Sequence, residues 1–293
     1  MSARLGALSA LALLAACASR EDAPTAPAAP PVERLFLRAP ESGHAHEIDI
    51  FRPSAPPPEG GYPVVLLLDG NRVSEVIRAA QGDGVRLDAV YVTLGYRGVR
   101  EFAVKERALD YTPEIEAGAR PADPLSEDRV NGGAGDFRRF IEREVKPAVS
   151  SRAPVDWRES TLWGHSYGGL FVLYAMLEDP GAYARYIAVD PSLWWRDAYL
   201  FERLMHEEVV TSARVQLLGA NADLPRAGHG RDPARVALRE RLHAALPEGA
   251  LEQVATRWGA TYRYYPSHTH GSLFAESLGE LLGPPGLNPG AAN

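Results

Sequence analysis

The stretch TLWGHSYGGLFVLYAML, residues 161–177, decides the fold of this chain. A short apolar run leads into Gly-His-Ser-Tyr-Gly at 164–168, and apolar residues at helical spacing follow it. These helical positions are Leu170, Leu173, Tyr174 and Leu177. A G-x-S-x-G motif between a strand and a helix is typical of a sharp turn that lifts the serine clear of a sheet. The stretch therefore predicts a strand, a tight turn at Ser166 and a helix that ends before Pro180-Gly181.

The glycines of this motif have a physical explanation. Side chains two positions before and after the serine would collide in so tight a turn, so Gly164 and Gly168 keep it free of them. The turn also presents the backbone N–H of Tyr167 beside the serine, at the positive end of the following helix. Ser166 is therefore the candidate nucleophile, and the N–H of Tyr167 is a candidate oxyanion donor.

Continuous apolar runs on both sides of this stretch predict further strands, because such runs fit strands that are buried on both faces. Together with 161–164, the expected strands are 34–37, 46–51, 63–69, 89–94, 186–189, 215–218 and 261–265. Apolar residues at helical spacing predict helices at 137–148, 170–177, 233–246 and 273–282. Strands that alternate with helices indicate an α/β fold. With the serine motif, the pattern predicts an α/β-hydrolase fold, a mostly parallel central sheet flanked by helices.

Residues 95–132 interrupt this alternation, because they contain no pattern for a long helix or strand. Loops of this length inside a compact domain are usually functional or disordered. The segment holds several basic residues close together: Arg97, Arg100, Lys105 and Arg107. We expect it to form a wall of the active site, and a solvated surface excursion is the alternative.

A serine becomes an effective nucleophile only when a base accepts its proton. His270 lies in Ser-His-Thr-His-Gly at 267–271, after the last strand pattern and before the last helix, where the histidine of this fold falls. His268 is the competing candidate. Two residues apart, the two side chains can point in opposite directions.

An acidic residue that orients the histidine is expected between the serine and the histidine in the chain. Asp223 follows the strand pattern 215–218 and is the preferred candidate. Asp190 follows the strand pattern 186–189 and is the alternative. Either residue could instead be an aspartate that only stabilises a turn.

Composition and charge exclude several classes of protein. The chain has 293 residues with 45% hydrophobic and 24% charged residues, which argues against a disordered chain or a coiled coil. Its net charge of −7 argues against a nucleic-acid partner. A single cysteine excludes a disulfide framework and a cysteine zinc site. The His-x-His pairs at 44–46 and 268–270 lack a metalloprotease motif or a dense ligand cluster, so we expect no metal and no cofactor.

The first residues read as a targeting signal. An apolar run from Leu5 to Ala16 follows Arg4, is too short to span a bilayer and ends in Leu-Ala-Ala-Cys at 14–17. This pattern predicts a lipoprotein signal peptide at 1–16 with lipidation of Cys17. Residues 17–32 would form a Pro/Ala-rich tether, 33–283 the catalytic domain and 284–293 a disordered tail. We therefore expect a periplasmic protein anchored by lipid to a bacterial membrane. The absence of Asp after Cys17 favours the outer membrane.

Five segments in register carry a resemblance to a known family. They are Leu-Asp-Gly-Asn at 68–71, Leu-Asp-Tyr-Thr-Pro at 109–113, Gly-His-Ser-Tyr-Gly-Gly at 164–169, Pro-Ser-Leu-Trp-Trp at 191–195 and His-Gly-Ser at 270–272. Together they resemble the putative-esterase family of α/β hydrolases, and within it the periplasmic trilactone esterases of catecholate siderophores such as enterobactin, salmochelin and bacillibactin. The resemblance implies Ser166 as nucleophile and His270 as base, and some members of the family work without an acid. Asp190 departs from the small residue expected before Pro-Ser.

The resemblance also implies further site residues. Gly70 and Asn71 lie where such enzymes place the second oxyanion donor. Arg107 stands where the siderophore branch has an arginine that faces the anionic ligand. Trp194 and Trp195 would line the pocket, although a pair of buried packing residues is the alternative.

These observations predict a serine esterase that hydrolyses carboxylic esters through an acyl-enzyme, with a ferric siderophore as a candidate substrate. One alternative is a carbohydrate-ester esterase or a general carboxylesterase of the same family. The other is a lipoprotein that binds a ligand on a hydrolase scaffold without turning it over.

Overall fold

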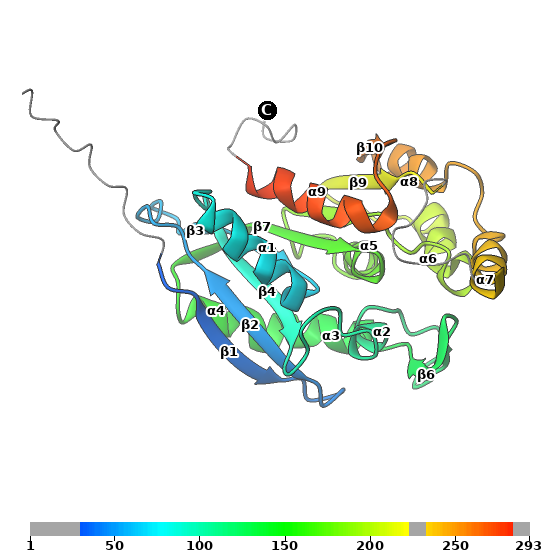
Figure 1. The fold of residues 1–293 in the computed structure, drawn as a ribbon, viewed down its shortest axis with the longest axis horizontal. Coiled ribbons are helices and arrows are strands. Elements are labelled where there is room, and N and C mark those ends of the chain that lie inside the picture. Colours follow the sequence, from blue (N-terminus) through cyan, green and yellow to red (C-terminus); the bar gives the residue numbers. More distant parts are fainter. Residues whose placement is uncertain (1–29, 223–232, 284–293) are drawn as a thin grey trace, which may run out of the picture.

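A sheet of eight strands runs through the part of the chain that the structure describes, residues 30–222 and 233–283 of a computed structural model (Figure 1). In spatial order the strands are β1 (Glu33–Arg38), β2 (Ala45–Phe51), β4 (Val90–Tyr96), β3 (Tyr62–Leu67), β7 (Val155–His165), β8 (Arg185–Val189), β9 (Arg214–Ala220) and β10 (Thr261–Tyr265). The strand β2 is antiparallel to both of its neighbours, and all other pairs in this sheet are parallel. The predicted mostly parallel sheet of an α/β hydrolase is confirmed.

The apolar strands are continuous because both faces of the sheet are covered. In β3, Val64 and Leu66 pack into the hydrophobic layer on one face, and Val65 and Leu67 pack into the layer on the other. All four are buried. A strand covered on only one face would alternate apolar and polar residues instead.

Helices form the two outer layers. They are α1 (Gly70–Gly82), α2 (Glu106–Asp110), α3 (Ala134–Phe140), α4 (Lys146–Ser150), α5 (Tyr167–Glu178), α6 (Trp195–His206), α7 (Pro233–His243), α8 (Ala250–Trp258) and α9 (His270–Leu282). The helices α1 and α9 contact each other and bury apolar residues against one face of the sheet (Figure 1). The opposite layer contains α3 to α6 and α8, with α5 against β7 and β8. The helix α5 is buried from Tyr167 to Leu177, which explains why its residues are apolar on all sides of the helix.

The helix expected at 137–148 is longer than predicted. A π-helical turn, Ile141–Val145, joins α3 to α4, and the helix continues beyond Pro147 to Ser150. Proline lacks the N–H that an α-helix needs and its ring crowds the carbonyl four residues earlier. A wider turn directly before Pro147 relaxes this crowding, so the proline does not end the helix.

The segment 95–132 contains only short elements. These are α2 and a small two-stranded sheet of β5 (Ala122–Asp123) and β6 (Ser126–Val130). The prediction that this segment lacks a long helix or strand is confirmed. Besides the short α2, the sequence analysis missed three helices outside this segment: α1, α6 and α8.

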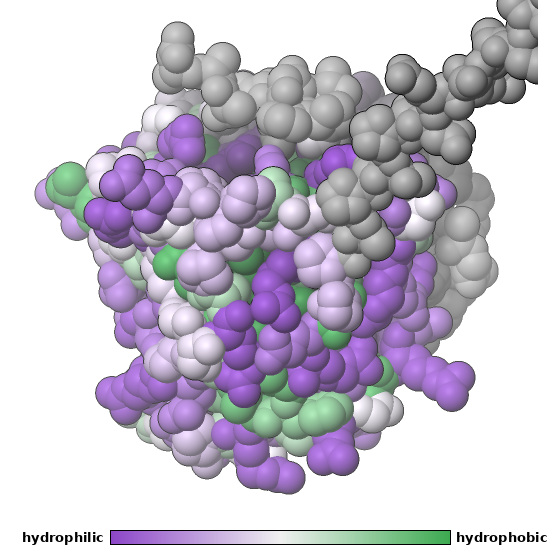
Figure 2. Space-filling model, turned by 90° about the vertical axis from the view of Figure 1, so that its left-hand side faces the viewer, coloured by the Kyte–Doolittle hydropathy of each residue, from purple (hydrophilic) through white to green (hydrophobic). Residues whose placement is uncertain are grey.

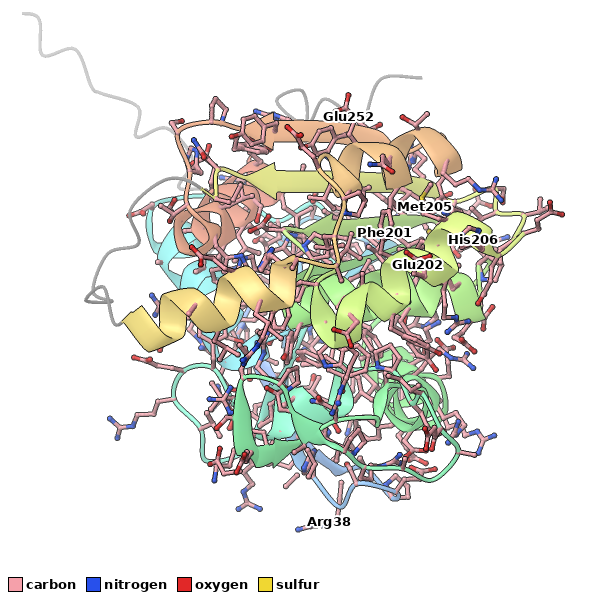
Figure 3. The ribbon with its side chains drawn as sticks, turned by 90° about the vertical axis from the view of Figure 1, so that its right-hand side faces the viewer. Arg38, Phe201, Glu202, Met205, His206 and Glu252 are labelled. Carbon is pink, nitrogen blue, oxygen red and sulfur yellow. The ribbon has the colours of Figure 1, made fainter. Side chains whose placement is uncertain are left out.

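The helices α6 and α8 lie side by side at one end of the sheet (Figure 3). The indole N–H of Trp258 donates to the carbonyl of Leu204 at 2.8 Å, and Arg257 donates to the carbonyl of Met205 at 3.3 Å. Phe201 is buried in the hydrophobic layer on this face of the sheet, and Met205 is partly buried against it.

The surface seen from the β1 and β2 side is mainly hydrophilic (Figure 2). Hydrophobic residues occur on that face in small separate groups. Within the described residues, no helix has the length and apolar character required to cross a bilayer. The predicted signal peptide, Cys17 and the tail 284–293 lie outside the described residues.

Candidate active site

Ser166 occupies a strained turn between β7 and α5. Its backbone has φ 61° and ψ −119°, a conformation that a residue with a Cβ rarely adopts. A Cβ on Gly164 would lie 2.4 Å from the carbonyl oxygen of Gly168, so the first glycine of the motif is sterically required. The Ser166 N–H donates to the carbonyl of Val189 at 2.9 Å, which ties the turn to the end of β8.

Asp190 and His270 form a direct pair. His270 Nδ1 donates to Asp190 Oδ2 at 2.5 Å, and Asp190 Oδ1 accepts from the N–H of Ala220 at 3.2 Å. Burial alone would raise the pKa of Asp190, but the hydrogen bond to His270, the charge of His270 and the N–H of Ala220 together outweigh burial and lower the pKa below the usual value. Asp190 itself has φ 40° and directly follows β8, so the backbone turn aims its carboxylate at α9.

The first turn of α9 holds His270 in place. Thr269 caps the helix by accepting a hydrogen bond from the N–H of Ser272, and Ser272 accepts one from the N–H of Thr269. This reciprocal cap fixes the start of the helix, where His270 is the first residue.

A pocket of about 230 Å³ joins the serine to the histidine pair. Ser166, Asp190 and His270 all line it, and Ser192 lies with its Oγ 3.3 Å from Ser166 Oγ. The segment 95–132 contributes part of the wall, as the sequence analysis expected: Val104, Arg107, Leu125 and Arg129. The helix α7 contributes Leu242 and His243.

The structure separates the two histidine candidates. His268 Nε2 lies 3.5 Å from Glu276 Oε2, and among the described residues that line the pocket His270 appears but His268 does not. The acid that meets His270 is Asp190, the alternative in the sequence analysis. Asp223, the preferred candidate, lies outside the described residues.

The oxyanion candidates differ in position. Tyr167 lines the pocket and is the first residue of α5, where the backbone N–H has no partner within the helix. Gly70 packs against β4, because a Cβ there would lie 2.4 Å from the backbone N of Gly95. The Asn71 side chain bonds to the backbone of Tyr96. The described residues that line the pocket include neither Gly70 nor Asn71.

Arg107 lines the pocket, but its guanidinium is already engaged. It donates to both carboxylate oxygens of Asp69 at 2.7 and 2.9 Å and to the carbonyl of His165 at 3.3 Å. Burial opposes its charge, yet Asp69 raises the pKa of Arg107. Burial also raises the pKa of Asp69, and the charge of Arg107 opposes that rise. Arg107 therefore supports the wall of the pocket rather than offering a free cation to a ligand.

Arg129 is a pocket cation that the sequence analysis missed. It lies on β6 and lines the pocket. Its Nε is buried without a hydrogen-bond partner, and its guanidinium forms no ion pair within residues 30–222 and 233–283. The sequence signal for Arg129 was its place in the segment 95–132. The basic residues singled out in that segment, from Arg97 to Arg107, all precede it.

The adjacent tryptophans have different environments. Trp194 lines the pocket, with its ring 5.8 Å from that of Tyr167. Trp195 is fully buried in the core, and its indole N–H donates to Asn131 Oδ1 at 3.0 Å. The structure therefore corrects the expectation for Trp195, which packs in the core and does not line the pocket.

His165, the variable position of the motif, lies under His270. Its Nε2–H donates to the carbonyl of His270 at 2.8 Å, and the two rings are 4.4 Å apart. Burial, and then the neighbouring His270, lower the pKa of His165 well below its usual value. His165 is therefore a neutral support for the backbone that carries His270.

The chain is similar to several known proteins. The family model described as "Putative esterase" matches residues 40–239. The ferri-bacillibactin esterase of Bacillus subtilis is 34% identical over 186 residues, 60% of this chain and 64% of its own length. The apo-salmochelin esterase of Escherichia coli is 28% identical over 232 residues, 78% of this chain and 71% of its own length. The solved structure of the BES protein from Bacillus cereus has 26% identity and a TM-score of 0.59, covering 86% of this chain and 94% of its own.

Proposed function

This chain belongs to the putative-esterase family of α/β hydrolases, and from that premise we propose that it is a serine esterase acting on siderophore esters. The observation that supports the chemistry is one pocket lined by Ser166, His270 and Asp190, with the last two joined at 2.5 Å. A nucleophile, a base and a group that orients the base are the parts that acyl transfer requires.

In the proposed reaction, Ser166 Oγ attacks the ester carbonyl while His270 accepts the hydroxyl proton. Asp190 holds the imidazole by Nδ1 and stabilises the imidazolium that forms. The N–H of Tyr167 stabilises the developing oxyanion. His270 then protonates the leaving alcohol, and a water molecule, deprotonated by His270, hydrolyses the acyl-enzyme to free acid and Ser166.

The proposal that the substrate is a siderophore ester rests on three observations. Two relatives are named as esterases of siderophores, bacillibactin and salmochelin. The pocket of about 230 Å³ is smaller than those that enclose a whole drug-sized ligand, so it takes one ester-bearing arm while the rest of the molecule lies outside. Arg129 lines this pocket without an ion-pair partner among the described residues, which suits an anionic substrate.

The experiment compares three substrates with the wild type and Ser166→Ala: an iron-loaded catecholate trilactone, a feruloyl sugar ester and p-nitrophenyl butyrate. We expect kcat/KM to be highest for the trilactone and all turnover to be lost in Ser166→Ala. A higher kcat/KM for the sugar ester would refute the siderophore assignment and leave the serine chemistry intact.

Arg129→Gln tests the recognition of charge. We expect it to raise KM for the iron-loaded trilactone roughly tenfold, the size of one charge-assisted contact, and to leave p-nitrophenyl butyrate hydrolysis unchanged. Arg100→Gln is the matched control, since Arg100 is exposed in the same segment and outside the pocket lining. Equal losses on both substrates would contradict the assignment to Arg129.

We further propose that the protein is a periplasmic lipoprotein anchored through Cys17, most consistent with the outer membrane. The support is the sequence pattern at 14–17 and the Pro/Ala-rich residues 19–32 after it. Labelled palmitate should be incorporated into the wild type and not into Cys17→Ser in a bacterial host. Equal labelling of the two proteins would refute the anchor.

A further inference from the structure

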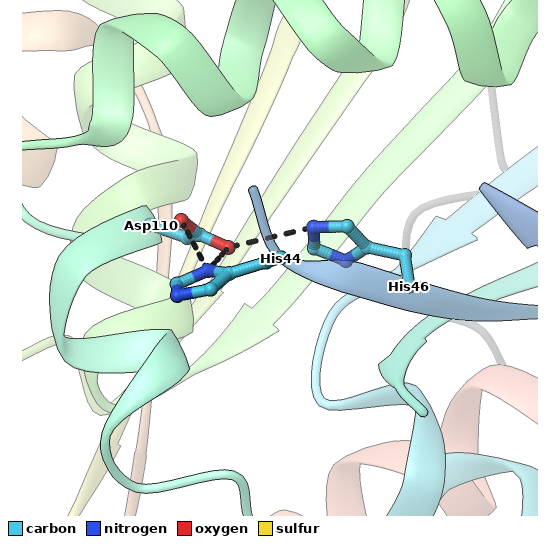
Figure 4. A group of neighbouring side chains, drawn as sticks. All are labelled: His44, His46 and Asp110. Atoms are coloured by element: carbon cyan, nitrogen blue, oxygen red, sulfur yellow. Dashed lines mark hydrogen bonds and ion pairs between the residues drawn. The ribbon is translucent and has the colours of Figure 1, made fainter. Parts of the chain in front are cut away.

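His44, His46 and Asp110 come together away from the pocket (Figure 4). His44 precedes β2, His46 lies near the start of β2, and Asp110 ends α2. His44 Nδ1 is 3.0 Å from Asp110 Oδ2, and His46 Nε2 is 3.6 Å from the same oxygen. One candidate ligand atom from each of the three residues lies within 4.8 Å of the others.

His46 is the unexplained member of this cluster. Its side chain is 0% exposed, and neither Nδ1 nor Nε2 has a hydrogen-bond partner among the residues that the structure describes. The carbonyl of Gly95 lies near the ring without meeting hydrogen-bond geometry. A buried imidazole without partners costs about 1–3 kcal/mol for each unsatisfied group, and native proteins contain few such groups.

Aromatic rings pack around His46, and its polar edge faces Asp110. Its ring packs on Tyr96 and Phe140 at 4.7 Å and on Phe137 at 5.4 Å. The nitrogen Nε2 faces the carboxylate of Asp110, 3.6 Å from Oδ2, so this side of the ring is the one that can meet a cation held by both residues.

We propose that His44, His46 and Asp110 form a binding site for Zn²⁺ or a divalent cation of the same ligand preference. Two imidazoles and one carboxylate are donors that zinc accepts. Zinc bonds of about 2.0–2.1 Å in tetrahedral geometry place neighbouring ligand atoms roughly 3.3 Å apart. The observed distances of 3.0 and 3.6 Å to Asp110 Oδ2 bracket this value. His44, whose side chain is 22% exposed, leaves room for a water molecule as fourth ligand.

The site has an oriented carboxylate, as metal sites require. Tyr96 donates its hydroxyl hydrogen to Asp110 Oδ2 at 3.0 Å, and Tyr96 pairs with His46 across β4 and β2. A hydrogen bond of this kind fixes the direction of a ligating carboxylate. When zinc binds, His44 Nδ1 gives up its proton to solvent, or the ring carries the proton on Nε2 instead, and the metal bond replaces the hydrogen bond to Asp110.

The ion would connect the start of β2, the second strand of the sheet, to the wall of the pocket. Asp110 and Arg107 lie one turn apart on α2, and Arg107 is the residue that ties this wall to Asp69. A metal bond between β2 and α2 therefore stabilises the pocket wall from behind. The role is structural, because Ser166 and His270 line a pocket to which none of the three ligands contributes among the described residues.

The test is zinc binding to the full-length protein after treatment with a chelator, followed by calorimetric titration with ZnSO₄ and by thermal unfolding. We expect one zinc per chain and a rise in Tm of roughly 5 °C at a hundredfold excess over Kd. Cobalt in place of zinc should give the absorption bands of a tetrahedral site.

Two variants remove a ligand, and a third serves as the control. His46→Phe suits the aromatic surroundings, and His44→Gln changes a partly exposed side chain. If one of these two variants does not fold, the other still tests the site. Each should weaken zinc binding at least tenfold and abolish the rise in Tm. His268→Gln, from the other His-x-His pair, should retain both. The proposal is overturned if the wild type binds no zinc, if His44→Gln binds it as tightly, or if only His268→Gln loses it.

Discussion

Replacing Asp190 with asparagine tests how the base is oriented. In the wild type, Asp190 Oδ1 accepts from the N–H of Ala220 and Oδ2 accepts from His270 Nδ1. In Asp190→Asn the amide oxygen keeps the bond to Ala220, because only an acceptor can face that N–H. The amide NH₂ then faces His270 and donates to Nδ1.

The consequence is the wrong tautomer of His270. An Nδ1 that accepts a hydrogen bond places the proton on Nε2, which then cannot accept the proton of Ser166. Loss of the correct tautomer in a triad of this kind costs about 10³–10⁴-fold in kcat, roughly 4–5.5 kcal/mol of activation free energy. KM should change little, because Asp190 loses no contact that holds the acyl group.

The assay is steady-state hydrolysis of p-nitrophenyl butyrate, with folding checked by circular dichroism. Asp223→Asn, the change at the candidate that was preferred from the sequence, is the comparison and should retain most of the activity. A kcat for Asp190→Asn within threefold of the wild type would refute the assignment. A larger loss in Asp223→Asn than in Asp190→Asn would give the role to Asp223.

The remaining predictions concern residues that support the site. Gly164→Ala should lower the free energy of unfolding by about 1–3 kcal/mol in urea titrations, because its Cβ would lie 2.4 Å from the backbone of Gly168; an unchanged midpoint would contradict the crowding. Arg107→Ala should cost about 3–5 kcal/mol by leaving the buried carboxylate of Asp69 unpaired, and chemical denaturation that gives less than 1 kcal/mol would argue against the pair. His165 is buried with its pKa below the usual 6.5, so as the pH falls below 6.5 the unfolded chain binds up to one more proton than the native state. The wild type should therefore lose up to about 1.4 kcal/mol of stability per pH unit as the pH falls from 6.5, and His165→Gln should show a flatter profile; identical profiles would exclude the effect.

The sheet was predictable because burial on both faces leaves a direct trace in the sequence. Every strand of the main sheet was located, most of them within two residues of the observed bounds, and β7 is longer because its first half is polar. The antiparallel pairing of β2 carries no comparable trace, since the direction of a strand is set by its connections.

The missed helices have weaker or interrupted patterns. Three residues near the start of α6, Arg196, Asp197 and Ala198, have positive φ, so its first turn does not follow helical spacing. The helices α1 and α8 do carry apolar residues at helical spacing, for example Val73 with Ile77, but polar neighbours obscure the pattern. These helices form because a tertiary surface is available for their apolar faces, which a local sequence does not encode.

The sequence was sufficient to predict the reacting residues Ser166 and His270, but not the acid beside His270 or the cation of the pocket. Ser166 lies in a motif whose spacing has a steric cause, whereas two aspartates satisfy the chain order equally. The choice of Asp190 depends on its φ of 40° and on the bond to Ala220, which are properties of the folded loop. The folded arrangement also decides between the two arginines of the pocket: Asp69 already engages Arg107, whereas Arg129 has no ion-pair partner within the part of the chain that the structure describes.

Covalent labelling with a fluorophosphonate is the most direct test that Ser166 is the nucleophile of an esterase. One adduct per chain should form on the peptide that contains Ser166, and Ser166→Ala, verified as folded, should form none. His268→Gln is the control and should label like the wild type. No adduct on the folded wild type, or an adduct that persists on Ser166→Ala, would contradict the account.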